Sequence, residues 1–442
     1  MAAELKLVRT AAEEAIVARF PTVKTSLAGD AGVVRLREAA FDLLAKRGLP
    51  HRRVEEWKYT DLRGLMREAA PLAERPAGAD AAAALKGAAA LAGLDACEIG
   101  FVNGHLMVEA SDLGGTPAGV EIVPLAEALA AGHALLKSMS PVDAARDNAA
   151  YALNTAFMND GAVIRIAAGR AVERPLHLRF VNTGAAPFST AVRILLVVEP
   201  GASATLIETH EGPGSLAYQP NTVVEIIAHD NAAVRHVRMN AEGDALALST
   251  LTAKLGAHVS FDTLNVAVGA SVARHQVFLT FAGEHTTARI NGATMLKDKQ
   301  HGDTTLLVDH AVPHCDSKEL FKTVIDDTAT GVFQGKIIVR PHAQKTDGRM
   351  MSASLLLSDG GTMNNKPELE IFADDVQCAH GATCGQLDED LLFYLMARGL
   401  PRKEAETLMV QAFLGEAVEL VEHEATREAL LAVIEGWLKA RH

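Results

Sequence analysis

The stretch Val192-Arg-Ile-Leu-Leu-Val-Val198-Glu-Pro200-Gly-Ala-Ser-Ala204-Thr-Leu-Ile207 holds two short runs of apolar, often branched residues with a turn between them. Val192–Val198 and Ala204–Ile207 are typical of β-strands, and the Pro-Gly pair at 200–201 is typical of a turn. Related turns recur as Asn231-Ala-Ala-Val, Gly256-Ala-His-Val and Gly269-Ala-Ser-Val. Such turn-and-strand units, unevenly spaced, favour a stacked solenoid over a sandwich.

Similar strand patterns extend through the middle of the chain. The further expected strands are Ala162–Ile166, Leu176–Phe180, Val223–Ile227, Val259–Leu264, Val272–Phe281, Thr304–Val308, Val332–Val339, Ser354–Leu357 and Leu369–Phe372. No helical pattern of ten or more residues interrupts this zone, which excludes βαβ folds. We therefore expect a mainly β protein.

The ends of the chain follow a different pattern. Residues 1–160 are Ala-rich and mostly helical in pattern, as in Arg35–Lys46, although Ile99–Val108 turns at Asn103-Gly104 like a hairpin. After 386, Asp388 suits a helix N-cap, and later apolar stripes indicate two further helices that pack on one another or dock a partner. We expect three domains: an N-terminal helical domain at 1–160, a β core at 161–385 and a C-terminal helical domain at 386–442.

Composition limits the classes of function. The chain has 442 residues, 49% of them apolar, with 42 Lys+Arg against 55 Asp+Glu, a net charge of −13. An acidic protein repels phosphate backbones, so we expect neither nucleic acid nor membrane as a partner. The N-terminus lacks a basic-then-apolar pattern, and the four cysteines are scattered, so we expect a cytoplasmic protein with reduced thiols.

The densest group of chemically reactive residues is Asp374-Asp-Val-Gln-Cys378-Ala-His380-Gly-Ala-Thr-Cys384. Cys378 and His380 are two residues apart, so in an extended strand both side chains point to the same face. Thiolate and imidazole are good ligands for iron or zinc, but the spacing matches neither a zinc ribbon nor a ferredoxin. From the residues alone, a metal or sulfur site and a buried Cys with a structural His both stay open. The two aspartates suit a turn better than a ligand set.

Other candidates have a simpler interpretation. His301, His310, His314 and Cys315 fall in the strand zone, where histidines commonly satisfy hydrogen bonds at a sheet face. Cys97 has no nearby histidine and is expected to be inert, and Glu422-His-Glu424 lies among solvated helix charges. Gly331-Val-Phe-Gln-Gly-Lys336 is too short for a phosphate-binding loop and is expected to be a strand.

Three stretches together resemble the SufD branch of the SufB/SufD family, the scaffold subunits of the SUF system for iron–sulfur cluster assembly. The stretches are Arg52-Arg-Val-Glu-Glu-Trp57-Lys-Tyr-Thr-Asp-Leu62, the segments from His310-Ala-Val-Pro-His-Cys315 to Leu355-Leu-Leu-Ser358, and the run from Lys366-Pro-Glu-Leu-Glu370 through Ala373-Asp-Asp-Val-Gln-Cys378-Ala-His380-Gly-Ala-Thr383 to Arg398-Gly399. The third stretch is the most specific, and the resemblance covers essentially the whole chain. Cys384 departs from it, as an added thiol or an apolar filler.

The resemblance implies a right-handed parallel β-helix between helical ends. It implies pairing with SufB through the β-helix and binding of the ATPase SufC at the C-terminal helices, with a homodimer as the alternative for the isolated chain. It places His380, with Cys378 beside it, at the SufB interface, where these two residues are the expected cofactor and metal contacts of a transient iron–sulfur cluster. No permanently bound cofactor is expected.

The resemblance also implies a non-enzymatic scaffold whose partner SufC hydrolyses ATP. An incomplete ligand set fits a site that a second subunit completes and that opens when the ATPase shifts the two subunits. Two alternatives stay open: a SufB-type paralogue, and a β-helix binding protein in which Cys378 and His380 are purely structural.

Overall fold

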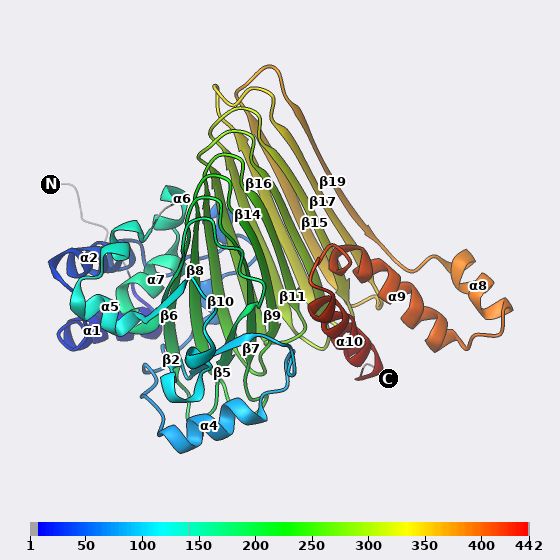
Figure 1. The fold of residues 1–442 in the computed structure, drawn as a ribbon. Coiled ribbons are helices and arrows are strands. Elements are labelled where there is room, and N and C mark those ends of the chain that lie inside the picture. Colours follow the sequence, from blue (N-terminus) through cyan, green and yellow to red (C-terminus); the bar gives the residue numbers. More distant parts are fainter. Residues whose placement is uncertain (1–7, 141, 441–442) are drawn as a thin grey trace, which may run out of the picture.

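A computed structural model describes residues 8–140 and 142–440. Its centre is a parallel β-solenoid of two facing sheets (Figure 1). Odd-numbered strands form the ten-stranded sheet β19-β17-β15-β13-β11-β9-β7-β5-β1-β2, and even-numbered strands form the nine-stranded sheet β18-β16-β14-β12-β10-β8-β6-β4-β3. Each coil therefore adds one strand to each sheet. The solenoid expected from the recurring turns is confirmed.

The solenoid strands are mostly nine or ten residues long and pair in parallel, without slippage, between successive coils. They are β4 (Asp160–Ile166), β5 (Leu176–Val181), β6 (Ser189–Val198), β7 (Ser203–Glu211), β8 (Gln219–Ala228), β9 (Ala233–Ala241), β10 (Leu246–Leu255), β11 (Ser260–Ala267), β12 (Val272–Phe281), β13 (Thr287–Leu296), β14 (His301–His310), β15 (Asp316–Ile325), β16 (Thr330–Val339), β17 (Asp347–Leu356), β18 (Thr362–Ile371) and β19 (Gln377–Gly385). Gly331–Lys336 lies in β16, so its strand interpretation is confirmed.

The recurring turns have one conformation in common. Gly201, Asn231, His258 and Ala270 all adopt positive φ angles, between 55° and 73°. The left-handed region is easily reached by glycine and more readily by Asn and His than by most other residues. A single left-handed residue in each turn lets the chain reverse direction and enter the next strand.

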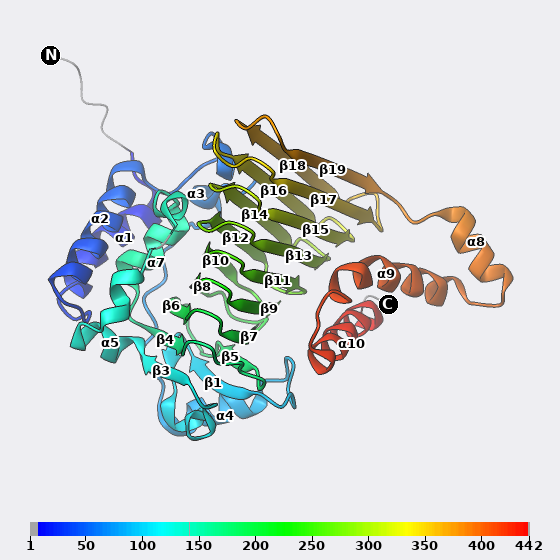
Figure 2. The same cartoon turned by 45° about the horizontal axis from the view of Figure 1, so that its top comes forward.

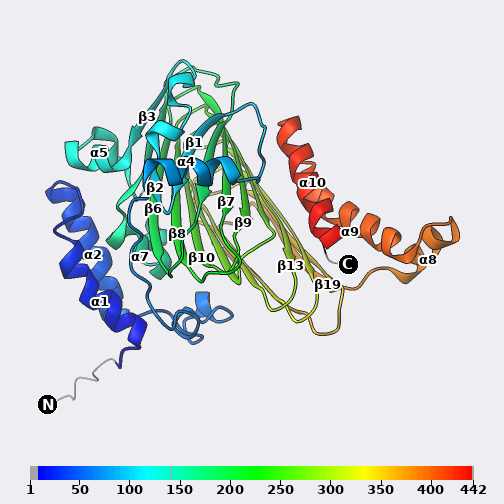
Figure 3. The same cartoon turned by 90° about the horizontal axis from the view of Figure 1, so that it is seen from below.

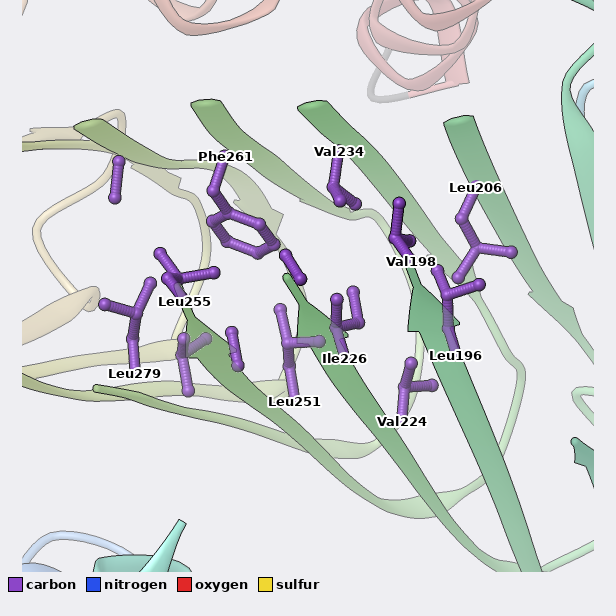
Figure 4. Packing of buried hydrophobic residues seen from close by; sticks show 14 of the residues in the cluster. Leu196, Val198, Leu206, Val224, Ile226, Val234, Leu251, Leu255, Phe261 and Leu279 are labelled. Carbon is purple, nitrogen blue, oxygen red and sulfur yellow. The ribbon is translucent and has the colours of Figure 1, made fainter. Parts of the chain in front are cut away.

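The space between the sheets is filled by one apolar core. Inward side chains from both sheets meet there, including Leu196 and Ile226 from even strands and Leu206 and Phe261 from odd strands (Figure 4). Successive coils stack like residues over one another because the registers are aligned. Burial of this apolar surface is the main stabilising contribution of the solenoid.

Helices cover the two outer faces of the solenoid (Figures 2 and 3). The N-terminal helices are α1 (Ala11–Val23), α2 (Ala31–Arg47), α3 (Leu62–Leu65), α4 (Gly78–Gly87), α5 (Leu125–Ala131), α6 (Asp143–Arg146) and α7 (Ala149–Phe157). The C-terminal helices are α8 (Glu389–Ala397), α9 (Arg402–Val418) and α10 (Glu424–Ala440). α1, α2, α5 and α7 pack on the even sheet, whereas α9 and α10 pack on the odd sheet. Among the described helices, none combines the length and apolar character needed to span a bilayer.

The N-terminal region is less purely helical than the sequence indicates. β1 (Cys97–Val102) and β2 (His105–Leu106) form the expected hairpin, and β1 also pairs in parallel with β5. β3 (Val120–Pro124) pairs antiparallel with β4. These strands cover one end of the solenoid, so the first coil has no free sheet edge.

A clamp joins the N-terminal region to the even sheet. Arg274 on β12 is fully buried, forms an ion pair with Asp303 on β14, and places its guanidinium 3.9 Å from the ring centre of Trp57. Arg274 also donates to the Glu56 carbonyl at 2.7 Å, and Thr60 donates to Asp303. The stretch Arg52–Leu62 therefore fixes the helices to the solenoid.

The candidate site at the uncovered end of the solenoid

The last coil consists of β18 and β19, and it leaves the solenoid open at this end. β19 pairs in parallel with β17, and no described strand pairs with its other edge. β18 likewise pairs with β16 alone within the described chain. Figure 2 shows these strands as the final layer, with α8 standing away from the sheets. An unpaired strand edge presents free N–H and C=O groups that can pair with another chain.

Cys378 and His380 lie on β19 and face the solenoid interior. Their register partners on β17 are Gly348 and Met350, and Met350 is buried in the core. A Cβ added to Gly348 would lie 3.6 Å from the Cys378 sulfur, which shows that the thiol sits against the inner wall. Cys378 is half-buried and His380 is exposed, since no further coil covers them. Both residues therefore line the open mouth of the solenoid.

Cys384 lies on the same inward side of β19, opposite Ser354. Its thiol is exposed. This exposure favours the interpretation of Cys384 as an added thiol over that as an apolar filler. Cys384 adds a third reactive side chain to the mouth.

Burial and nearby carboxylates act on the Cys378 thiol. Burial raises the pKa of Cys378, and the carboxylates of Asp347 and Glu319 raise it further, whereas the Gly348 amide opposes them. The free thiol therefore keeps its proton at neutral pH. A bound cation reverses this balance, since metal binding favours the thiolate.

Glu319 is a feature of the site that the sequence analysis missed. It lies in the same inward column as Met350 and His380, two strands before the mouth, and its side chain is 2% exposed. Neither carboxylate oxygen has a well-formed hydrogen bond. Burial raises the pKa of Glu319 to about 8, although the Ser317 hydroxyl opposes the shift. Glu319 gives no signal in the sequence, since Asp316-Ser-Lys-Glu-Leu320 lies outside the expected strands.

The turn before β19 has a structural role. Asp375 forms an ion pair with Lys345, and its backbone amide donates a hydrogen bond to the Gln344 side chain at 2.9 Å. Neither contact points to a role in the mouth. Asp374 is exposed. The aspartates are turn residues, as the sequence indicates. Among the residues that the structure describes, no three His, Cys, Asp or Glu side chains lie close enough to hold a metal ion together.

His301, His310, His314 and Cys315 do not form a common site. His301 bonds to Thr60 at 2.9 Å, and His310 bonds to Ser317 at 3.0 Å inside the core. His314 is exposed on a turn, whereas Cys315 beside it is buried. The expectation that strand histidines satisfy hydrogen bonds is confirmed for His301 and His310.

The remaining sequence candidates also have structural roles. Cys97 is buried and donates to the Asp112 carbonyl at 3.3 Å. Glu422 forms an ion pair with Arg235, and His423 bonds to Thr426 at 2.8 Å at the start of α10. These contacts agree with the interpretation that neither region is a ligand site.

The C-terminal helices are only partly packed. Asp388 caps α8 through the amides of Asp390 and Leu391, as expected. α9 and α10 bury Val410, Leu414 and Leu430 on the odd sheet. The sequence places Leu408 and Leu420 in an apolar stripe that packs on other helices or docks a partner, and both side chains are exposed.

α8 carries an apolar surface that the sequence analysis did not identify. Phe393 is 73% exposed and Tyr394 is 52% exposed, and Leu391, Met396 and Leu408 of α9 extend the same exposed set. We call these five residues the α8 apolar surface. Exposed aromatic residues of this size are typical of interaction sites.

Comparison with known proteins identifies the relatives of this chain. Residues 24–178 match the family model described as the SufBD protein N-terminal region, and residues 180–413 match that of the SufBD core domain of SUF system FeS cluster assembly. The chain is 32% identical over 404 residues to an iron–sulfur cluster assembly SufBD family protein of Synechocystis, covering 89% of this chain and 88% of the relative. It is 30% identical over 409 residues to the iron–sulfur cluster assembly protein SufD of Escherichia coli, covering 88% and 90%.

Proposed function

Because the chain belongs to the SufBD family of iron–sulfur cluster assembly proteins, we propose that it is a SufD-type scaffold subunit that pairs with SufB and builds a transient cluster at the open mouth. The observation that carries the proposal is the position of Cys378 and His380. They face the interior of a coil that lacks a covering layer, next to a free strand edge. Relatives named SufD favour this branch over a SufB-type paralogue.

The free edge supports pairing with a second subunit. β18 and β19 offer two parallel edges, one in each sheet, and a partner solenoid placed end to end can continue both. Such a partner covers His380 and brings its own ligands opposite Cys378. Thiolate and imidazole from one side, with sulfur or carboxylate ligands from the other, make a donor set suited to iron. The isolated chain can use the same edges to form a homodimer.

The α8 apolar surface supports binding of the ATPase SufC. α8 stands apart from the two sheets (Figure 2), and the five side chains of this surface are exposed. ATP hydrolysis in SufC then shifts the two scaffold subunits as rigid bodies, opening the mouth and releasing the cluster. The chain itself acts as an assembly subunit. The proposal locates it in the cytoplasm, where its four free thiols stay reduced.

The test is the cluster content of the complete complex. The chain is co-expressed with SufB and SufC, the complex is purified without oxygen, and iron and acid-labile sulfide are measured per complex. We expect His380→Ala and Cys378→Ala to lower both values, whereas His342→Ala, an exposed histidine in a turn, leaves them unchanged. Unchanged iron and sulfide in His380→Ala, with the complex intact, would remove His380 from the mechanism.

A further inference from the structure

A cavity of about 320 Å³ lies between the N-terminal region and the outer face of the even sheet. Its floor includes a row of outward residues on successive even strands, with Phe278 on β12, Leu307 on β14 and Lys336 on β16. Its walls come from residues 47–57 and from the residues around the start of α7. The volume falls in the range of pockets that hold a small organic molecule.

Part of the lining is apolar. Leu49, Pro50 and Trp57 belong to the wall, and Phe278 and Leu307 belong to the floor. Trp57 and Phe278 are buried, whereas Leu307 is half-buried, so its outward side chain stays partly uncovered. A ligand with an apolar body can therefore bury further apolar surface against this floor.

The lysine and arginine side chains of the lining already have acidic partners. The pairs are Arg47 with Asp147 at 3.8 Å, Lys336 with Glu370 at 2.8 Å, and Lys366 with both Glu55 and Glu368. His51 accepts a hydrogen bond at Nδ1 from the Arg53 amide, which corresponds to a neutral imidazole. An anionic ligand would have to displace one of these carboxylates before it gained an ion pair.

Glu56 adds negative charge to the lining. Its carbonyl accepts hydrogen bonds from Arg274 at 2.7 Å and from Gln334 at 3.1 Å, which fix its backbone against the even sheet. In the described part of the chain, its exposed carboxylate forms no hydrogen bond or ion pair. Because Lys366 is also shared between two carboxylates, the lining carries more negative than positive charge. Charge complementarity therefore favours a cationic ligand.

We propose that this cavity binds a small organic ammonium ion with an apolar body. The body covers the floor at Phe278 and Leu307, and the ammonium group pairs with the carboxylate of Glu56. The apolar contact contributes affinity, and the surplus of carboxylates selects against anions of the same size.

The cavity is separate from the candidate site, although both involve β18. Leu369 of β18 packs against the solenoid core, whereas Lys366 and Glu368 line the cavity. Since successive side chains of a strand point to opposite faces, the cavity and the mouth lie on opposite sides of β18. Ligand binding here therefore does not depend on the proposed role in cluster assembly.

The test is isothermal titration calorimetry of the full-length chain at neutral pH. Three probes of nearly equal size and different charge are compared: phenethylammonium, phenethyl alcohol and hydrocinnamate. We expect phenethylammonium to bind most tightly, the neutral alcohol to bind more weakly, and hydrocinnamate not to bind measurably. A native chain that binds no phenethylammonium at millimolar concentration, or that binds hydrocinnamate equally well, would overturn the proposal.

Two variants place the ligand in the cavity. Glu56→Gln removes one charge and is expected to weaken phenethylammonium binding by about threefold to fivefold. Leu307→Trp fills the floor from the outer face of the sheet and is expected to weaken binding by about tenfold or more. Glu428→Gln, which alters an exposed glutamate on α10, leaves binding unchanged, and thermal unfolding confirms that each variant is folded. Either cavity variant binding as tightly as the native chain would also contradict the proposal.

Discussion

Replacing Glu319 by Gln is expected to stabilise the protein in a manner that depends on pH. The Glu319 carboxyl is flanked along its column by Ile290 and Met350, both buried, and lacks a well-formed hydrogen bond. Its pKa is about 8 in the folded chain, against an ordinary value of 4.5. The folded protein therefore binds more protons than the unfolded protein between these two values, so stability falls as the pH rises from about 4.5 to about 8.

The magnitude follows from the two pKa values. At pH 7 the carboxyl is ionised in the unfolded protein but protonated in the folded protein. Since pH 7 lies about 2.5 units above the ordinary pKa, this difference destabilises the fold by about 3 kcal/mol, at 1.36 kcal/mol per unit. The penalty is below about 1 kcal/mol at pH 5 and about 4 kcal/mol at pH 8. Glutamine carries no charge, so Glu319→Gln removes this penalty. Any packing cost of the amide is the same at both pH values, and the pH 5 to pH 8 difference, about 3 kcal/mol, is the quantity to compare.

The assay is urea unfolding followed by far-UV circular dichroism at pH 5 and pH 8. The variant is compared with the native chain and with Glu428→Gln, which alters an exposed glutamate on α10. We expect the free energy of unfolding to rise in Glu319→Gln at pH 8 far more than at pH 5, and to change little in the control. An equal change at both pH values would refute the assignment of a buried, unpaired acid.

Two further predictions concern the fold. Gly161→Ala places a Cβ 1.8 Å from the Arg193 carbonyl oxygen at a φ of 148°, so we expect loss of soluble expression, whereas Gly114→Ala, which has open space, leaves expression and the melting temperature unchanged. Arg274→Leu leaves the Asp303 carboxylate buried without its cation and is expected to cost about 3–5 kcal/mol, measured by urea unfolding. Adding Asp303→Leu to Arg274→Leu should recover most of that loss, and a double variant as unstable as the single one would show that the ion pair is not the cause.

The sequence predicts most strands of the solenoid but not all of them. Every expected strand between Ala162 and Phe372 overlaps an observed one, and the recurring turns sit at left-handed positions. β9, β10, β13 and β15 were not among the expected strands. In β9 the inward residues include His236 and Arg238, which pair with Glu208 and Asn265 inside the core. Buried polar pairs hide the alternation that marks a strand.

β19 was missed for the opposite reason. Its inward residues Cys378, His380, Ala382 and Cys384 lack a covering coil, so no apolar alternation is needed. The sequence located the candidate residues through their spacing and through the family resemblance. It did not show that they face the open mouth, nor that Glu319 lies behind them, since both facts depend on the register of three strands.

The sequence identifies the stretch Arg52–Leu62 as a family signature but does not show what this stretch does in the structure. Trp57 stands out in the sequence as one of only two tryptophans. Its function as a cover for the Arg274–Asp303 pair depends on residues more than two hundred positions away. Such long-range pairing has no local signal in a single sequence.

The central claim is that a partner subunit covers the last coil, and cysteine alkylation tests it most directly. The chain is treated with N-ethylmaleimide, alone as a monomer and in the proposed complex with SufB and SufC, and the modified peptides are quantified by mass spectrometry. Cys97 and Cys315 are buried and serve as internal controls that react slowly in both samples. We predict that the exposed Cys384 and the half-buried Cys378 react in the monomer and are protected in the complex. A Cys384 that reacts equally fast in both samples would contradict the account.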